Sequence, residues 1–189
     1  MRKNSTLLFT RIGILGVIGM SATLLSGCMN DEIETVYEKF KDWRIQNEQY
    51  MADEETKMEG GLPYYTKLAP NWAPDAYALV HWHNDTMLTR KNLVPMDNST
   101  VEFTYELFDI EGNKIQDSFS NVDSVYTSKP NTNIVGVWYP LTRMHEGDSV
   151  TIVMPYQAAY GARTQGSIKP YSALIYNIKL KKGKAYEIK

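Results

Sequence analysis

The chain has 189 residues, of which 20 are basic and 22 acidic, and a formal net charge of −2. Nucleic-acid binding normally needs a basic face, so no nucleic-acid partner is expected. One cysteine in the whole chain excludes an internal disulfide and a cysteine-based metal cluster.

The first 27 residues are typical of the signal peptide of an exported bacterial lipoprotein. Basic residues at Arg2 and Lys3 precede an apolar or small-residue run over residues 12–25, and Leu25-Ser26-Gly27-Cys28 fits the bacterial lipobox. The run is shorter than the roughly 20 residues that a membrane-spanning helix usually needs. We therefore expect cleavage before Cys28 and lipidation of this cysteine, with palmitate among the attached chains; the alternative is an uncleaved signal anchor.

The residues after the cysteine indicate in which membrane the lipoprotein is located. Met29 follows Cys28 in place of the aspartate that signals retention at the inner membrane, and Asp31 and Glu32 make the next positions acidic. This pattern is similar to the surface-export signal of some gut-dwelling Gram-negative lipoproteins. The expected location is a lipid anchor in the bacterial outer membrane, on its periplasmic or cell-surface face.

An amphipathic helix is predicted over residues 31 to about 52. Its apolar stripe consists of Ile33, Val36, Tyr37, Phe40 and Trp43. Three arrangements are open for this stripe: it packs on the chain's own domain, it contacts a second copy in a homodimer, or the helix is a semi-rigid stalk. Glycines at 60 and 61 end the helical region, so residues 28–61 form the lipid-attached N-terminus and helix, and residues 62–189 form the main domain.

A strand is predicted over residues 76–84, followed by a polar connection through Asn98. His81, His83 and Asp85 fall at every second position, hence on one strand face that could present metal ligands. Two imidazoles and one carboxylate without a further partner are more typical of a solvated face, so we expect no metal site.

Alternating apolar residues predict three further strands, which begin near Val101, Val150 and Leu174. Leu141 and Met144 predict a short helix around residues 137–145 with Pro140 in its first turn, and Gly147 ends it. This order of elements indicates an α+β domain, in which an antiparallel sheet has one helix across it.

The run over residues 134–180 resembles the FKBP family of peptidyl-prolyl isomerases. It has the family's short helix, Gly-bounded strand, Ala159-Tyr160-Gly161 turn, Ile-x-Pro loop at Ile168 and final alternating strand. The resemblance covers residues 99–182 and implies a curved antiparallel β-sheet wrapped around a short helix. It also implies binding of proline-containing polypeptide segments, without a cofactor.

Isomerisation of a peptide bond before proline makes and breaks no covalent bond, and its uncatalysed barrier is roughly 20 kcal/mol. An enzyme needs only a water-poor cleft with a few donors that favour the twisted amide. By resemblance, these catalytic donors are the Tyr160 hydroxyl and the Ile134 backbone N–H. The residues that would bind substrate are Tyr105, Ile115, Val137, Ile168 and Tyr176, and ordinary core packing is the alternative for each.

Two sequence motifs of the family carry substitutions, at three positions. Val137 stands where relatives have the tryptophan that floors the cleft, and Trp138 follows one position later, about 100° further around the helix. Ile115 replaces the pocket aromatic residue, and Gln116 replaces the pocket acid. The pocket is therefore expected to be wider, or refilled by Tyr126, Tyr139 or Trp138.

Two functions follow as alternatives. The first is an FKBP-type isomerase or folding helper (chaperone) for exported proteins, with a slow rate because the floor and the acid are substituted. The second is a non-catalytic FKBP-like lipoprotein that binds a protein or peptide partner; a third possibility is an envelope- or glycan-associated protein that keeps only the architecture. The position of Trp138 discriminates between the enzyme and the binding module. An indole under Tyr105, Tyr160 and Tyr176 favours the enzyme, and an indole that faces solvent or the N-terminal helix favours binding.

Overall fold

The structure is a computed structural model that describes residues 34–121 and 123–184. These residues belong to one structural unit, Glu34–Lys189. The predicted signal peptide and Cys28 lie outside the described residues. No helix in the described part of the chain has the length and apolar character needed to cross a membrane.

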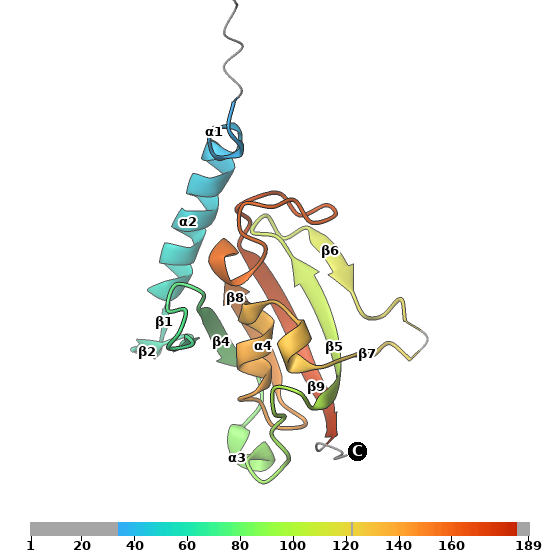
Figure 1. Cartoon of the computed structure of the whole chain (residues 1–189). Coiled ribbons are helices and arrows are strands. Elements are labelled where there is room, and N and C mark those ends of the chain that lie inside the picture. The colour runs from blue at the N-terminus through green and yellow to red at the C-terminus, as the bar shows by residue number, and fades with distance from the viewer. Residues whose placement is uncertain (1–33, 122, 185–189) are drawn as a thin grey trace, which may run out of the picture. The chain divides into compact units, whose positions relative to one another are not determined.

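The central element is a seven-stranded sheet in which every pairing is antiparallel. Its order is β3-β4-β8-β9-β5-β6, and β7 pairs with β5 (Figure 1). The strands are β3 (Thr66–Leu68), β4 (Ala78–Trp82), β5 (Thr100–Phe108), β6 (Lys114–Asp117), β7 (Tyr126–Ser128), β8 (Ser149–Met154) and β9 (Leu174–Lys184). A separate hairpin of β1 (Met58–Glu59) and β2 (Leu62–Pro63) turns at two positive-φ glycines, Gly60 and Gly61. The predicted α+β class is confirmed.

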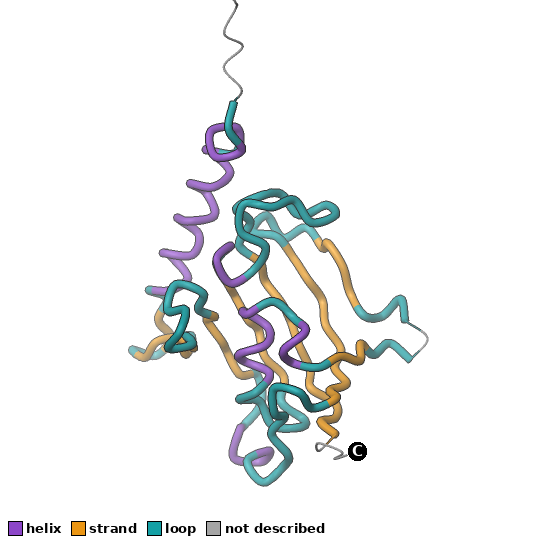
Figure 2. The backbone as a smooth tube through the Cα atoms, in the orientation of Figure 1, coloured by secondary structure: helices purple, strands orange, loops and turns teal. Residues whose placement is uncertain are grey.

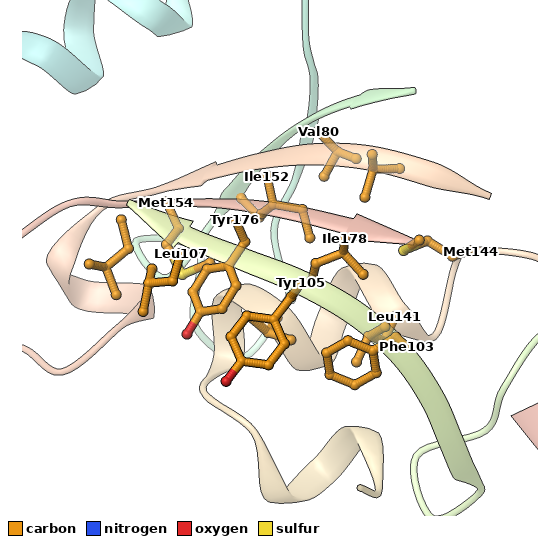
Figure 3. Close-up of a cluster of buried hydrophobic side chains, with 14 of the residues drawn as sticks. Val80, Phe103, Tyr105, Leu107, Leu141, Met144, Ile152, Met154, Tyr176 and Ile178 are labelled. Carbon is orange, nitrogen blue, oxygen red and sulfur yellow. The ribbon is translucent and has the colours of Figure 1, made fainter. Parts of the chain in front are cut away.

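One face of the sheet carries the main core. Alternate residues of β5 are buried, and the corresponding residues of β4, β8 and β9 join them in one cluster (Figure 3). Helix α4 (Val135–Leu141) lies across this face and contributes Val137 and Leu141 to the cluster (Figure 2). The predicted alternation of the three strands is thus confirmed by burial.

The boundaries of α4 differ from the prediction. The helix begins at Val135 and ends at Leu141, so Pro140 lies in its last turn and not in its first. Proline has no N–H to donate to the carbonyl four residues earlier, and the helix ends one residue after it. The chain then turns at Gly147, whose φ is +93°, before β8.

The opposite face of the sheet packs against the N-terminal helix. A second buried cluster joins Met51 to Leu79, Val153 and Ala173, which point away from the main core because neighbouring strand residues face opposite sides. The helix therefore packs on its own domain, one of the three predicted alternatives. A homodimer through the same helix stays a prediction.

The prediction of a single helix over residues 31–52 is wrong in two respects. Phe40, at φ −106° and ψ 21°, separates α1 (Val36–Lys39) from α2 (Lys41–Glu55). The buried residues of α2 are Asn47 and Met51, whereas Val36 and Tyr37 of the predicted stripe are 48% and 49% exposed. A polar side chain at the centre of the buried face, Asn47, hid that face from the apolar pattern.

The connection after β4 contains the short helix α3 (Thr86–Thr89), and each of the three residues considered as metal ligands has another contact. Asp85 caps α3 by accepting the Met87 N–H at 2.9 Å, and His81 Nδ1 lies 2.9 Å from the Tyr64 carbonyl. His83 Nε2 lies 2.8 Å from Thr151 Oγ1. The described residues contain no group of three or more histidine, cysteine, aspartate or glutamate side chains that could hold a metal ion.

Candidate functional site

A cleft of about 250 Å³ opens between the first turn of α4 and strands β5, β6, β7 and β9. Its walls also include Tyr160, which follows the short helix η2 (Tyr156–Ala158), and the end of η1 (Pro130–Thr132) with the two residues after it. The lining residues are Phe103, Tyr105, Gln116, Tyr126, Thr132, Asn133, Ile134, Val137, Tyr160 and Tyr176. Five of the seven residues predicted to form the site are therefore brought together here.

An aromatic row forms one wall of the cleft. Tyr105 on β5 and Tyr176 on β9 have ring centroids 5.7 Å apart, and Figure 3 shows both hydroxyls pointing the same way. Tyr126 on β7 packs edge-on against Phe103 at 5.4 Å and against Tyr105 at 5.7 Å. Of the three aromatic residues predicted as candidates to refill the pocket, Tyr126 is the one that does so.

Two hydrogen-bond donors belong to residues that line the cleft, Tyr160 and Ile134. The Tyr160 turn is held by the Gly161 N–H, which donates to the Tyr156 carbonyl at 2.9 Å, and by the Tyr171 N–H, which donates to the Gly161 carbonyl at 2.8 Å. Ile134 is the N-cap of α4, and its N–H has no acceptor among the described residues. A peptide carbonyl in the cleft could therefore accept from both groups.

The tyrosine hydroxyls of the cleft are neutral donors near pH 7. Burial is the main reason that the pKa of Tyr105, of Tyr160 and of Tyr176 is raised, and the Tyr160 hydroxyl adds to the effect at Tyr176. None of the described residues that line the cleft carries an acidic, basic or imidazole side chain. The arrangement can desolvate an amide and hydrogen-bond to it, but it offers no general acid or base of ordinary pKa near neutrality.

The floor of the cleft is Val137, whose residue exposure is 3%. Trp138 points away from the cleft, because its Nε1–H donates to Asp97 Oδ1 at 2.6 Å and its ring lies 5.7 Å from that of Trp72. Trp138 and Tyr139 line a different cavity on the outer side of α4. The one-residue offset between Val137 and Trp138 therefore has the expected effect, and the indole is not under the three tyrosines.

The structure places Ile115 and Ile168 outside this cleft, which corrects the prediction that they line it. Both border a neighbouring cavity of about 210 Å³, together with Trp43 of α2. On β6, Gln116 lines the cleft, whereas Ile115 packs against the main core cluster. A register shift between Leu107 and Phe108 disturbs the pairing opposite Ile115. Ile168 is buried in the main core.

Three lining residues were not predicted: Phe103, Thr132 and Asn133. Asn133 Nδ2 donates to the Lys129 carbonyl at 2.8 Å and to Ser128 Oγ at 3.1 Å, which fixes the entry into α4. Phe103 shares the inward face of β5 with Tyr105, so strand alternation could have found it. No sequence pattern marked Thr132 or Asn133, because their position depends on how η1 meets the sheet.

Residues 92–181 match the sequence profile of the family described as FKBP-type peptidyl-prolyl cis-trans isomerase. The fold is similar to that of a peptidyl-prolyl cis-trans isomerase from Pseudomonas syringae pv. tomato, with a TM-score of 0.62 and 22% identity over 77% of this chain and 96% of that chain. It is also similar to FkpA from Escherichia coli, with a TM-score of 0.60 and 21% identity over 77% of this chain. The match spans 63% of the FkpA chain, which is less than two thirds of its length. Comparison with curated proteins gives no match.

Proposed function

We propose that the protein binds proline-containing polypeptide segments in the cleft and catalyses their cis–trans isomerisation slowly, as the match of residues 92–181 to the FKBP-type profile suggests. The observation that carries this proposal is the placement of the Tyr160 hydroxyl and the free Ile134 N–H around one aromatic cavity. A volume of about 250 Å³ is below the roughly 300–1,000 Å³ of pockets for drug-sized ligands. It suits one or two residues of a peptide.

Catalysis in such a cleft depends on stabilising the twisted amide more than the planar one. The neutral aromatic walls remove water from the amide, and the two donors can hydrogen-bond to carbonyl oxygens. A hydrogen bond of this kind contributes about 0.5–1.5 kcal/mol net. The slow rate is proposed because Val137 covers less of the bound ring than an indole would, and Gln116 supplies no charge.

One observation favours a second candidate, a non-catalytic module that holds a proline-containing partner. Trp138 is turned away from the cleft and bonded to Asp97, so the aromatic floor is not rebuilt from the neighbouring position. Binding needs only the cavity and its donors, whereas rate enhancement also needs preferential contact with the twisted state. The same cleft therefore supports binding without requiring fast isomerisation.

The two candidates separate in one pair of measurements on the purified protein. A short peptide with a single proline is followed for its isomerisation rate, and the same peptide is titrated for binding. Acceleration proportional to protein concentration supports the isomerase. Binding without acceleration supports the non-catalytic module, and neither binding nor acceleration overturns both.

We also propose that the protein is a lipoprotein of the outer membrane that assists the folding of exported proteins. The support is the sequence Leu25-Ser26-Gly27-Cys28 and the absence of aspartate at the next position. Cells grown with labelled palmitate should label the wild type and not Cys28→Ser, which should accumulate as an unprocessed precursor. Labelling of the Cys28→Ser protein would overturn the assignment.

A further inference from the structure

A second cavity, of about 850 Å³, lies on the outer side of α4 and not in the cleft. Its walls include Trp72, Met96, Asp97, Asn131, Trp138 and Tyr139. Trp72 is 63% exposed and Met96 is 67% exposed. Large apolar side chains that a fold leaves exposed around a hollow are a mark of a binding surface.

Specific contacts hold the walls of this cavity, which we call the groove. Asp97 accepts the Trp138 indole N–H at 2.6 Å, and its backbone carbonyl accepts the Asn131 N–H at 3.0 Å. The Arg143 guanidinium lies 3.2 Å from the centre of the Tyr139 ring and donates to the Tyr139 carbonyl at 2.9 Å. The Trp72 and Trp138 rings are tilted by 36° with their centroids 5.7 Å apart, so they pack against each other in the groove wall.

The groove has no excess of charge that would favour a charged segment. Its one carboxylate, Asp97, and its one guanidinium, Arg143, already have partners within the groove. The side-chain amides of Asn98 and Asn131 also line it, and neither makes a hydrogen bond to another described residue. Indole faces can cover an apolar or aromatic side chain, and free amides can pair with the N–H and C=O groups of an extended backbone.

The groove is continuous in sequence and in space with the wall of the cleft. Val137 and Trp138 are consecutive residues of α4, with the first in the cleft and the second in the groove. Likewise Asn131 borders the groove, while Thr132 and Asn133 border the cleft. One helix with its side chains is about 10–12 Å across, and an extended chain advances about 3.3 Å per residue. Three or four extended residues therefore span the distance.

We propose that the groove is a second subsite for the polypeptide that occupies the cleft. It takes an aromatic or other large apolar side chain located about three to five residues from the bound proline. The inference rests on the proposed function, and it specifies the substrate class: an extended, uncharged segment with an apolar residue at that spacing. Engagement of two subsites by one chain adds affinity without any change in the cleft.

The test compares labelled peptides with the purified protein by fluorescence anisotropy. One peptide has a single proline with short flanks, and longer ones carry phenylalanine or serine four residues before or after the proline. We expect one of the phenylalanine peptides to bind about two- to tenfold more tightly than its serine counterpart. Trp72→Ala should remove this preference, whereas Leu88→Ala, at an 81% exposed residue outside the groove, should keep it.

The outcomes separate the two proposals. Binding of the short peptide without any phenylalanine preference overturns the second subsite and keeps the proposed function. A phenylalanine preference that survives in Trp72→Ala also overturns the subsite. If the short peptide does not bind and the longer ones bind only through Trp72, the proposal that one polypeptide occupies both the cleft and the groove is wrong. Trp72-dependent binding of a neutral oligosaccharide such as maltohexaose, without phenylalanine preference, would reassign the groove to a glycan.

Discussion

The Asn47 side-chain oxygen accepts the backbone N–H of Ala173 at 2.7 Å, across 126 positions of the sequence. Asn47 Nδ2 donates to the Trp43 carbonyl at 2.7 Å, and Trp43 Nε1–H donates to Ser172 Oγ at 3.0 Å. These bonds tie α2 to the residues that lead into β9, the strand that carries Tyr176. The N-terminal helix is thus part of the domain that forms the cleft.

Asn47→Ala should lower the free energy of unfolding by about 1–3 kcal/mol, because the substitution leaves the buried Ala173 N–H without an acceptor. Urea unfolding followed by tryptophan fluorescence measures the change. Gln46→Ala removes an exposed amide from the same helix and should leave stability within about 0.5 kcal/mol of the wild type. Equal effects of the two substitutions would contradict the structural role of Asn47.

Tyr160→Phe should reduce a measurable isomerisation rate by up to roughly tenfold, since one hydrogen bond contributes about 0.5–1.5 kcal/mol. The measurement is kcat/KM for a short proline peptide. Tyr139→Phe removes the same hydroxyl group from a residue outside the cleft and is the matched control. A rate that is the same in Tyr160→Phe and the wild type would exclude the hydroxyl from the reaction.

Val137→Trp should raise the isomerisation rate about two- to tenfold, because the indole would cover the bound ring from the floor of the cleft. Overpacking of this buried position should cost about 1–3 kcal/mol of stability, so both the rate and the unfolding curve are measured. Val137→Leu enlarges the side chain without an aromatic face and should not reproduce the gain. A folded Val137→Trp protein that binds peptide but shows no gain would favour the non-catalytic module.

Asp148 should make the protein less stable in acid. Its buried carboxylate accepts Thr89 Oγ1–H at 2.6 Å, the His145 N–H at 2.8 Å and Asn84 Nδ2–H at 3.0 Å. Burial alone would raise the pKa of Asp148, but these hydrogen bonds outweigh it and the pKa is lowered. A carboxyl group with a lower pKa in the folded state stabilises the fold above its unfolded pKa of about 3.9, and this contribution is lost as pH falls through the folded pKa.

The expected result is that Asp148→Asn lowers the free energy of unfolding by about 1–3 kcal/mol at pH 7, and that the difference from the wild type shrinks toward pH 3. Asp75→Asn, at an exposed position, is the control and should leave the pH profile unchanged. A difference between Asp148→Asn and the wild type that is constant from pH 7 to pH 3 would show that the charge of Asp148 does not contribute.

The local sequence pattern was sufficient to predict the strands and part of the cleft. Val101, Phe103 and Tyr105 alternate with solvent-facing neighbours, so the inward face of β5 follows from the period of two. The 100° turn per helix residue likewise separated Val137 from Trp138. Both inferences depend only on short-range geometry, which sequence spacing determines.

What the sequence could not determine depends on long-range pairing. Tyr126 refills the pocket because β7 pairs with β5 next to Phe103, and nothing near Tyr126 in the chain indicates that partner. Ile115 leaves the cleft because the pairing of β5 with β6 shifts register at that point. The buried face of α2 was missed because its central residue, Asn47, is polar and bonds to Ala173, which is distant in the sequence.

The contact between Gly136 and Met154 determines whether the cleft can change its floor. A Cβ atom at Gly136 would overlap the Met154 sulfur, so the helix approaches β8 closely only where the side chain is a hydrogen. If α4 slid by one residue to bring Trp138 beneath Tyr105, Val137 would take the place of Gly136 and its Cβ atom would meet the Met154 sulfur. An exchange of the valine floor for a tryptophan floor would therefore also require the buried Met154 side chain to move.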